Sequence, residues 1–283
     1  MRINSAKDDA AGLQIADRLT SQINGLNQGN RNASDGIALA QTMEAGMDEI
    51  SGMLQKVRTL AVQANNGTNT SDDRRAIGKE MEALVNEVNR IAQKTTFAGK
   101  TILNGKIAGS IFGDPAAAGG AAGPAGATGT LTLQVGSNKG DTISFTADSV
   151  MFSKIGAGDL MGNAADKVFK TSADGTITVT LTKAKTDTSN TSIAEIVNLM
   201  DSMISKVDGA RADLGALQNR LESSIRNQSN VAANEADARS RIRDADFAEE
   251  SANLSQQSII QQAAASMLMQ ANTRPQLGLS LLG

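Results

Sequence analysis

The sequence contains no cysteine, histidine, tryptophan or tyrosine, and its 283 residues include only three prolines and six phenylalanines. Without cysteine or histidine there can be no Cys/His zinc site, no Ser-His-Asp triad and no thiol nucleophile. Lysines and carboxylates remain, but they are interspersed along the chain as on solvated helix faces. No phosphate-binding loop or metal motif is found. We therefore expect no catalytic, cofactor-binding or metal-binding residues, and we expect that the protein is not an enzyme.

Charge and hydropathy exclude two further classes of partner. The formal net charge of −3 offers no basic surface to nucleic acid. No uninterrupted apolar run approaches the ~20 residues of a membrane-spanning helix. The first residues lack the apolar segment of a cleaved signal peptide. We therefore predict neither nucleic-acid binding nor membrane insertion, in a chain that is either cytosolic or exported by a dedicated machine.

Composition divides the chain into two arms around a different middle. Residues 1–107 and 191–283 are rich in Ala, Leu, Asn, Gln, Arg and Glu, whereas residues 108–190 are rich in Gly, Thr, Ala and Asp. Large rings are rare, so the core must be built from Leu, Ile, Val, Met and Ala, which suit helix–helix seams. Both arms are therefore expected to be helical.

The middle predicts a small β element rather than a large separate domain. Residues 113–126 are typical of a flexible, low-complexity linker of Gly and Ala. Apolar and polar residues then alternate over 131–145, with a turn at 136–141, which predicts a β-hairpin. Residues 177–181 predict another strand.

The first arm predicts two helices. Ser5 followed by Asp8 indicates an N-cap with an acidic residue in the first turn. Residues 65–68 interrupt the pattern, and Ser71 indicates the N-cap of a second helix. The first helix carries apolar residues at alternating spacings of four and three, typical of a coiled-coil seam: Met43, Met47, Ile50, Leu54, Val57, Ala61 and Ala64.

The second arm carries the clearest periodicity. A helix from about Ile193 to Arg239 would be about 70 Å long, and it cannot bury an apolar stripe on itself. The stripes of the first arm are its natural partners. We therefore predict a mainly α fold, an elongated antiparallel helical bundle or coiled-coil rod made from both chain ends, with a small β-rich insertion. The predicted rod seam consists of Ile196, Met200, Met203, Val207, Leu214, Leu217 and Leu221.

The C-terminal segment is apolar and poor in charge. We interpret it as an amphipathic stretch that must pack on a partner, which is this chain's own N-terminus, neighbouring copies or a chaperone. Its expected contact residues are Leu254, Ile259, Ile260, Met267, Leu268, Leu277, Leu279, Leu281 and Leu282.

Six stretches of both arms carry a resemblance to one family. They are Arg2–Gly12, Leu54–Gln63, Phe97–Gly99, Gly215–Arg220, Ala238–Phe247 and Leu279–Leu282. Together these motifs are specific, and they cover nearly all of the chain outside residues 108–190. On them, the sequence resembles the bacterial flagellins.

The resemblance implies a structural subunit that polymerises with other copies into the extracellular filament of the bacterial flagellum, for motility. It implies export by the flagellar secretion apparatus without a cleaved signal peptide. It also implies four parts: residues 1–107 as the N-terminal arm of the rod, 108–190 as a variable insertion, 191–247 as the long C-terminal helix of the rod, and 248–283 as the C-terminal half of an inner-tube helical domain.

The resemblance implies further partners: an export chaperone on the C-terminal segment, the filament cap and junction proteins, and the vertebrate innate receptor for flagellin. The matching receptor patch is Lys56, Leu60 and Glu80, with Lys56 where many relatives have arginine. Family members place about thirty more residues before Arg2, so residues 248–283 are expected to lack their helical partner here.

Two alternatives follow from the resemblance. A hook–filament junction protein of the same superfamily would share the terminal pattern. A metalloprotease-bearing flagellin would need a histidine-containing zinc motif, which the absence of histidine excludes.

Overall fold

The computed structural model describes residues 1–107, 109–113, 128–156, 161–162, 168–172, 176–181 and 193–282. Long helices come from both ends of the chain, and short strands lie between them, so the predicted mainly α fold with a small β-rich insertion is confirmed. The helices are α1 (Ala10–Ala64), α2 (Ser71–Lys94), α3 (Phe152–Ile155), α4 (Ile193–Arg243) and α5 (Phe247–Leu282). The strands are β1 (Thr96–Phe97), β2 (Lys100–Thr101), β3 (Gly129–Gln134), β4 (Thr142–Ala147), β5 (Met161–Gly162), β6 (Phe169–Thr171) and β7 (Ile177–Val179).

The chain forms two compact units. One contains residues 26–229, and the other contains residues 1–25 together with 230–283. Helices α1 and α4 each contribute to both units, because each unit takes one end of each helix. The two units are described separately below.

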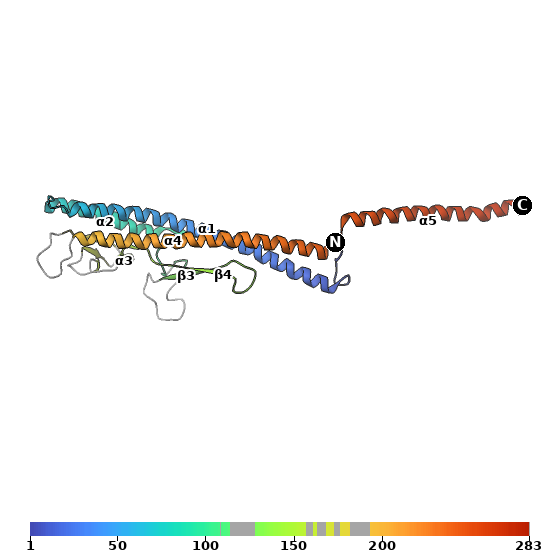
Figure 1. Cartoon of the computed structure of the whole chain (residues 1–283), viewed down its shortest axis with the longest axis horizontal. Coiled ribbons are helices and arrows are strands. Elements are labelled where there is room, and N and C mark those ends of the chain that lie inside the picture. The colour runs from blue at the N-terminus through green and yellow to red at the C-terminus, as the bar shows by residue number, and fades with distance from the viewer. Residues whose placement is uncertain are drawn as a thin grey trace. The chain divides into compact units, whose positions relative to one another are not determined.

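In the unit of residues 26–229, α1, α2 and α4 run side by side and share one core (Figure 1). The periodic residues of α1 from Met43 to Ala64 are buried, and the stripe of α2 at Ile77, Met81 and Val88 packs into the same cluster. Fully buried methionines and alanines let the helices approach closely without aromatic rings. The seam spacing of the first arm thus corresponds to the core-facing side of α1.

Helix α1 begins later than its first cap signal suggests. Asp9, not Ser5, caps it, since the Asp9 carboxylate accepts hydrogen bonds from the backbone N–H groups of Ala11 and Gly12, at 3.0 and 2.9 Å. The Asp8 carboxylate instead accepts from the N–H groups of Asn4 and Ser5, which lowers the pKa of Asp8. The prediction of Ser5 as the N-cap was wrong, because Asp9, four residues further along the chain, takes that role.

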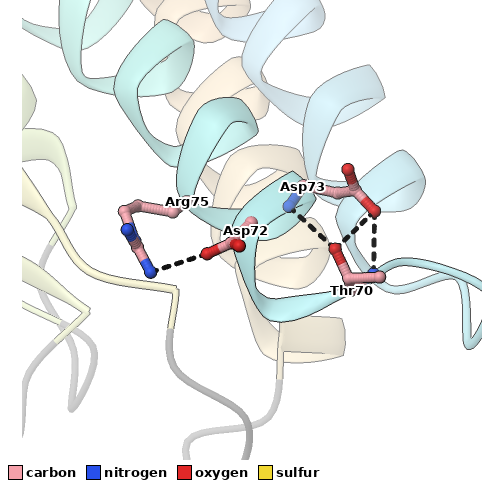
Figure 2. Close-up of polar contacts among 4 residues, drawn as sticks. All are labelled: Thr70, Asp72, Asp73 and Arg75. Atoms are coloured by element: carbon pink, nitrogen blue, oxygen red, sulfur yellow. Dashed lines mark hydrogen bonds and ion pairs between the residues drawn. The ribbon is translucent and has the colours of Figure 1, made fainter.

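The connection between α1 and α2 is closed by two caps. The N-cap of α2 is Thr70 rather than the predicted Ser71, and Thr70 and Asp73 form a reciprocal capping box (Figure 2). The Asp73 carboxylate accepts hydrogen bonds from the Thr70 hydroxyl at 2.7 Å and from the Thr70 N–H at 2.9 Å. These bonds, the hydroxyl's first, lower the pKa of Asp73. The Arg74 guanidinium donates to the carbonyl oxygen of Ala64 at 3.1 Å, which caps the end of α1.

The hairpin of β3 and β4 packs on small residues of α1. The strands pair antiparallel, with Leu133 opposite Ile143, and the connection lies at the predicted turn. On α1, Gly29 leaves room for the carbonyl oxygen of Val135, and Gly36 leaves room for the Leu133 side chain. The glycines therefore let the hairpin backbone lie directly against the helix.

A second small sheet packs on α2. It has the order β5–β6–β7, with β5 parallel to β6 and β6 antiparallel to β7. The Asn86 carboxamide on α2 donates to the carbonyl oxygen of Ile177 at 2.9 Å and accepts from its N–H at 2.8 Å. One turn away, the Glu82 carboxylate accepts from the N–H of Val179 at 3.1 Å. Helix α2 thus supplies hydrogen bonds to β7 that a neighbouring strand would otherwise supply.

In the unit of residues 1–25 and 230–283, the N-terminal residues close the end of α4. The backbone N–H groups of Arg2 and Ile3 donate to the carbonyl oxygen of Arg243, at 2.7 and 3.3 Å, and the Arg2 guanidinium donates to the carbonyl of Ile242. Ile3 is buried above Gly12. Carbonyl groups that the last turn of a helix leaves unpaired are therefore satisfied here.

Candidate functional site

Helix α5 carries most of the large apolar side chains that are exposed in the described chain. It starts after a short break, where the Asp246 carboxylate accepts from the N–H of Ala248 at 2.8 Å and caps the helix. Glu249 and Glu250 lie in its first turn, where negative charge is favourable. A helix that is well formed in this way presents its side chains in fixed directions.

The apolar side chains of α5 face solvent. The predicted contact residues Leu254, Ile259, Ile260, Met267 and Leu268 are all exposed, as are Phe247 and Met269, with exposed fractions between 57% and 87%. Scattered apolar residues are normal on a surface, but a concentration on one element marks an interaction site. The predicted side-chain contacts of Leu277, Leu279, Leu281 and Leu282 lie outside the described residues, although the α5 backbone continues to Leu282.

These apolar residues are not confined to one face of α5. Successive helical residues are about 100° apart, so Met267, Leu268 and Met269 together span about 200° of the helix circumference. Ile259 and Ile260 likewise face different directions. These side chains therefore do not form one narrow stripe, and covering all of them takes contacts from more than one side.

The predicted rod seam lies inside the three-helix core. Its residues are at most 4% exposed. Two ion pairs beside the seam mark the register of α1 against α4. Arg58 pairs with Asp201 at 2.5 Å, and Asp48 pairs with Arg211 at 3.0 Å. The two residues on α1 are as far apart in sequence as their two partners on α4, and the partners come in the opposite order. The helices are therefore antiparallel with no slip between the two ion pairs.

The three residues of the predicted receptor patch lie on α1 and α2. Lys56 and Glu80 are exposed, and Leu60 is half-buried and packs against the core. In the part of the chain that the structure describes, no hydrogen bond or ion pair involves the Lys56 ammonium or the Glu80 carboxylate. A partner could therefore reach both charged groups and the edge of Leu60 without displacing internal contacts.

An open groove of about 820 Å³ lies between β4 and α4. Its lining includes Lys154, Lys206, Asp213 and Arg220, and the Lys206 ammonium already donates to the carbonyl of Ile155 at 2.8 Å. Among the described residues no group of acidic side chains could hold a metal ion. Nor is any helix in the described part of the chain long and apolar enough to span a bilayer.

Some surface and packing residues escaped sequence reasoning. Phe247 belongs to the exposed apolar set of α5, and its charged neighbours Asp246, Glu249 and Glu250 gave no signal of an apolar surface. The contacts of Asn86 and Glu82 with β7 had no signal either, because asparagine and glutamate on a helix usually face water.

Two family models match the two arms of the chain. One, for the bacterial flagellin N-terminal helical region, matches residues 1–108, and the other, for the bacterial flagellin C-terminal helical region, matches residues 197–282. Among curated proteins, Flagellin B of Vibrio cholerae serotype O1 is 35% identical over 100% of this chain and 90% of its own length. A flagellin of Halalkalibacterium halodurans is 36% identical over 100% of this chain and 88% of its own length.

Two solved structures are similar to this chain. A structure titled as a flagellar hook-associated protein from Vibrio parahaemolyticus has a TM-score of 0.57 at 15% identity, covering 84% of this chain and 100% of its own. A flagellin from Bacillus cereus has a TM-score of 0.47 at 26% identity, covering 72% of this chain and 94% of its own. The first of these likenesses concerns the fold alone.

Proposed function

The chain belongs to the bacterial flagellin family, and from that membership we propose that it is the repeating subunit of the flagellar filament shaft that serves motility. Flagellins are structural proteins rather than enzymes, and they assemble with copies of themselves into an extracellular filament. The proposal goes further, because it assigns this chain to the shaft and not to a junction at its base.

The observation that supports the proposal is the apolar surface of α5. Exposed Leu, Ile and Met side chains point in several directions from one helix. A single partner in a pairwise complex covers one face of a helix, whereas a subunit inside a helical polymer is surrounded by several neighbours. Burial from several sides is thus the environment that α5 requires, and a continuous homopolymer supplies it.

The parts of the chain take separate roles in this proposal. Residues 1–107 and 191–247 form the rod, whose buried seam from Ile196 to Leu221 keeps the helices in register. Residues 108–190 form the variable insertion, and residues 248–283 contribute to the inner tube. The rod seam supports this division because its side chains are buried by contacts within the chain. The apolar side chains of α5, in contrast, are exposed and available for contacts with other chains.

Other partners follow from the exposure of α5 before assembly. An export chaperone that covers Leu254, Ile259 and Ile260 prevents premature association, and the secretion apparatus then exports the chain without a cleaved signal peptide. The absence of cysteine supports this route, since no disulfide has to be broken to unfold the chain. The cap and junction proteins contact the same surface at the two ends of the filament.

The vertebrate flagellin receptor binds Lys56, Leu60 and Glu80 in this proposal. Exposure of the two charged groups beside a half-buried leucine supports the assignment. A lysine at position 56 offers a point charge instead of the planar fork of arginine, so Lys56→Arg should strengthen receptor signalling. Signalling that is unaffected by Lys56→Arg, Lys56→Ala and Glu80→Ala would place the contact elsewhere.

The proposal that this chain forms the filament shaft is tested by whether its filaments grow without a length limit. The purified full chain is brought to increasing sulfate concentration, which favours apolar burial, and short fragments of the product are added to fresh chain. Electron microscopy should show filaments that lengthen in proportion to the chain added. Particles that stop growing at a fixed small size support the junction alternative, and a chain that stays monomeric contradicts both.

A further inference from the structure

Two sets of methionines in the described chain lie at opposite extremes of exposure. Met43, Met47, Met81, Met200 and Met203 in the helical core are at most 2% exposed. In contrast, Met267 and Met269 on α5 are 74% and 73% exposed. A thioether sulfur reacts with oxidants only where they can reach it, so the two groups differ in chemical reactivity.

We propose that Met267 and Met269 are a paired oxidation site that switches assembly off, with peroxides as the reacting class. A sulfur lone pair of each thioether attacks one oxygen of hydrogen peroxide, and the O–O bond breaks as the S–O bond forms. The sulfur is oxidised to the sulfoxide, and the peroxide, after proton transfer, is reduced to water. One peroxide is consumed for each methionine, and no further reactant is required.

The position of the pair decides the consequence. The two methionines flank Leu268, so a sulfoxide at each position places polar oxygens in two directions on an exposed apolar turn of α5. Burying a polar group without a hydrogen-bond partner opposes association. This step rests on the proposed function, because it takes α5 to be buried between subunits.

Assembly protects the same residues. Once α5 is covered by neighbouring subunits, the sulfur atoms are no longer reached by solvent, so oxidation selects chains that have not assembled. The modification is reversible, because methionine sulfoxide reductases restore the thioether of each sulfoxide epimer. The pair therefore couples the supply of competent subunits to the oxidant level.

Peptide mapping by mass spectrometry tests the selectivity. The unassembled full chain is treated with a series of hydrogen peroxide concentrations, and the sulfoxide fraction at each methionine is followed over time. Met267 and Met269 should be oxidised at least about tenfold faster than Met43 or Met200, and at a rate similar to that of Met1, which is 69% exposed. Equal rates at seam and α5 methionines would overturn the proposal.

Seeded growth tests the consequence. Treatment should raise the concentration of chain needed for growth by about tenfold, and reductase treatment should reverse it. In a Met267→Leu/Met269→Leu double variant, compared with its own untreated sample, peroxide should have no such effect. An equal loss in the double variant overturns the switch. Untreated wild type that does not grow contradicts the proposed function instead, and the mapping still decides whether the pair is selective.

Discussion

The carboxamide of Asn86 pairs with the peptide group of Ile177 in both directions, donating to its carbonyl oxygen at 2.9 Å and accepting from its N–H at 2.8 Å. A side chain on α2 therefore takes the place of a strand at the edge of β7. Glu82, one turn earlier on α2, extends the same edge to Val179. The helical core and the small sheet are joined by polar pairing as well as by apolar packing.

Replacing Asn86 should expose the value of this pairing. Asn86→Leu keeps a good helix former but leaves both groups of Ile177 unpaired, so the free energy of unfolding should fall by about 1–3 kcal/mol. Chemical denaturation measures the change. Asn227→Leu, at an exposed position of α4, is the matched control and should change stability little. Similar losses in the two variants would mean that the pairing contributes nothing specific.

Two glycines of α1 should respond to alanine with opposite signs. A Cβ at Gly29 would overlap the carbonyl oxygen of Val135, a backbone atom that cannot move cheaply, so Gly29→Ala should destabilise the chain by about 1–3 kcal/mol. Gly52 has open space around it, so Gly52→Ala should stabilise the same helix by about 0.5–1 kcal/mol. Thermal melts of the two variants give the comparison. Stabilisation by both would show that the hairpin is not seated on Gly29.

The fold could be predicted from the sequence where spacing alone carries the information. The alternation of four and three from Ile196 to Leu221 marks the buried side of α4, and alternating residues mark the hairpin. The pairing of Asn86 with Ile177 could not be predicted, because it depends on the register between elements far apart in the chain.

Two other features could not be predicted from the sequence: the residue that caps α1 and the directions in which the side chains of α5 point. Ser5, Asp8 and Asp9 are all able to cap a helix, so the sequence leaves the start of α1 ambiguous, and the geometry selects Asp9. On α5, composition marks a segment dense in apolar residues, but the directions of its contacts do not follow from it, because consecutive residues such as Met267 and Leu268 point about 100° apart.

A charge inside the seam should be far more damaging than one beside it. Leu214→Asp buries a carboxylate with no partner in the seam and should lower the free energy of unfolding by about 3–5 kcal/mol. Ala212→Asp adds the same charge at an exposed position of the same helix and should cost much less. Urea titration followed by circular dichroism distinguishes them. If both variants unfold at the same midpoint, the seam assignment at Leu214 is wrong.

The capping box of α2 should make stability depend on acidity. Since the folded chain holds the pKa of Asp73 below its ordinary value of 3.8, the unfolded chain binds the proton more readily. The contribution of Asp73 is therefore complete above about pH 5 and is lost as the pH falls through the folded pKa. The difference in Tm between wild type and Asp73→Asn should stay constant from about pH 7 to about pH 5 and then shrink towards about pH 2.5. A difference that stays constant over this range would contradict the ionised capping box.

In this account, contacts of α5 join one subunit to its neighbours, whereas the buried seam stabilises the fold of each subunit. Leu268→Asp tests it most directly, with Ala212→Asp as a control of equal charge. After seeding, the sedimented fraction of each chain is measured beside its thermal melt. The account predicts that Leu268→Asp melts like wild type but stays in the supernatant, whereas Ala212→Asp sediments. Leu268→Asp chains that sediment as wild type does would contradict it.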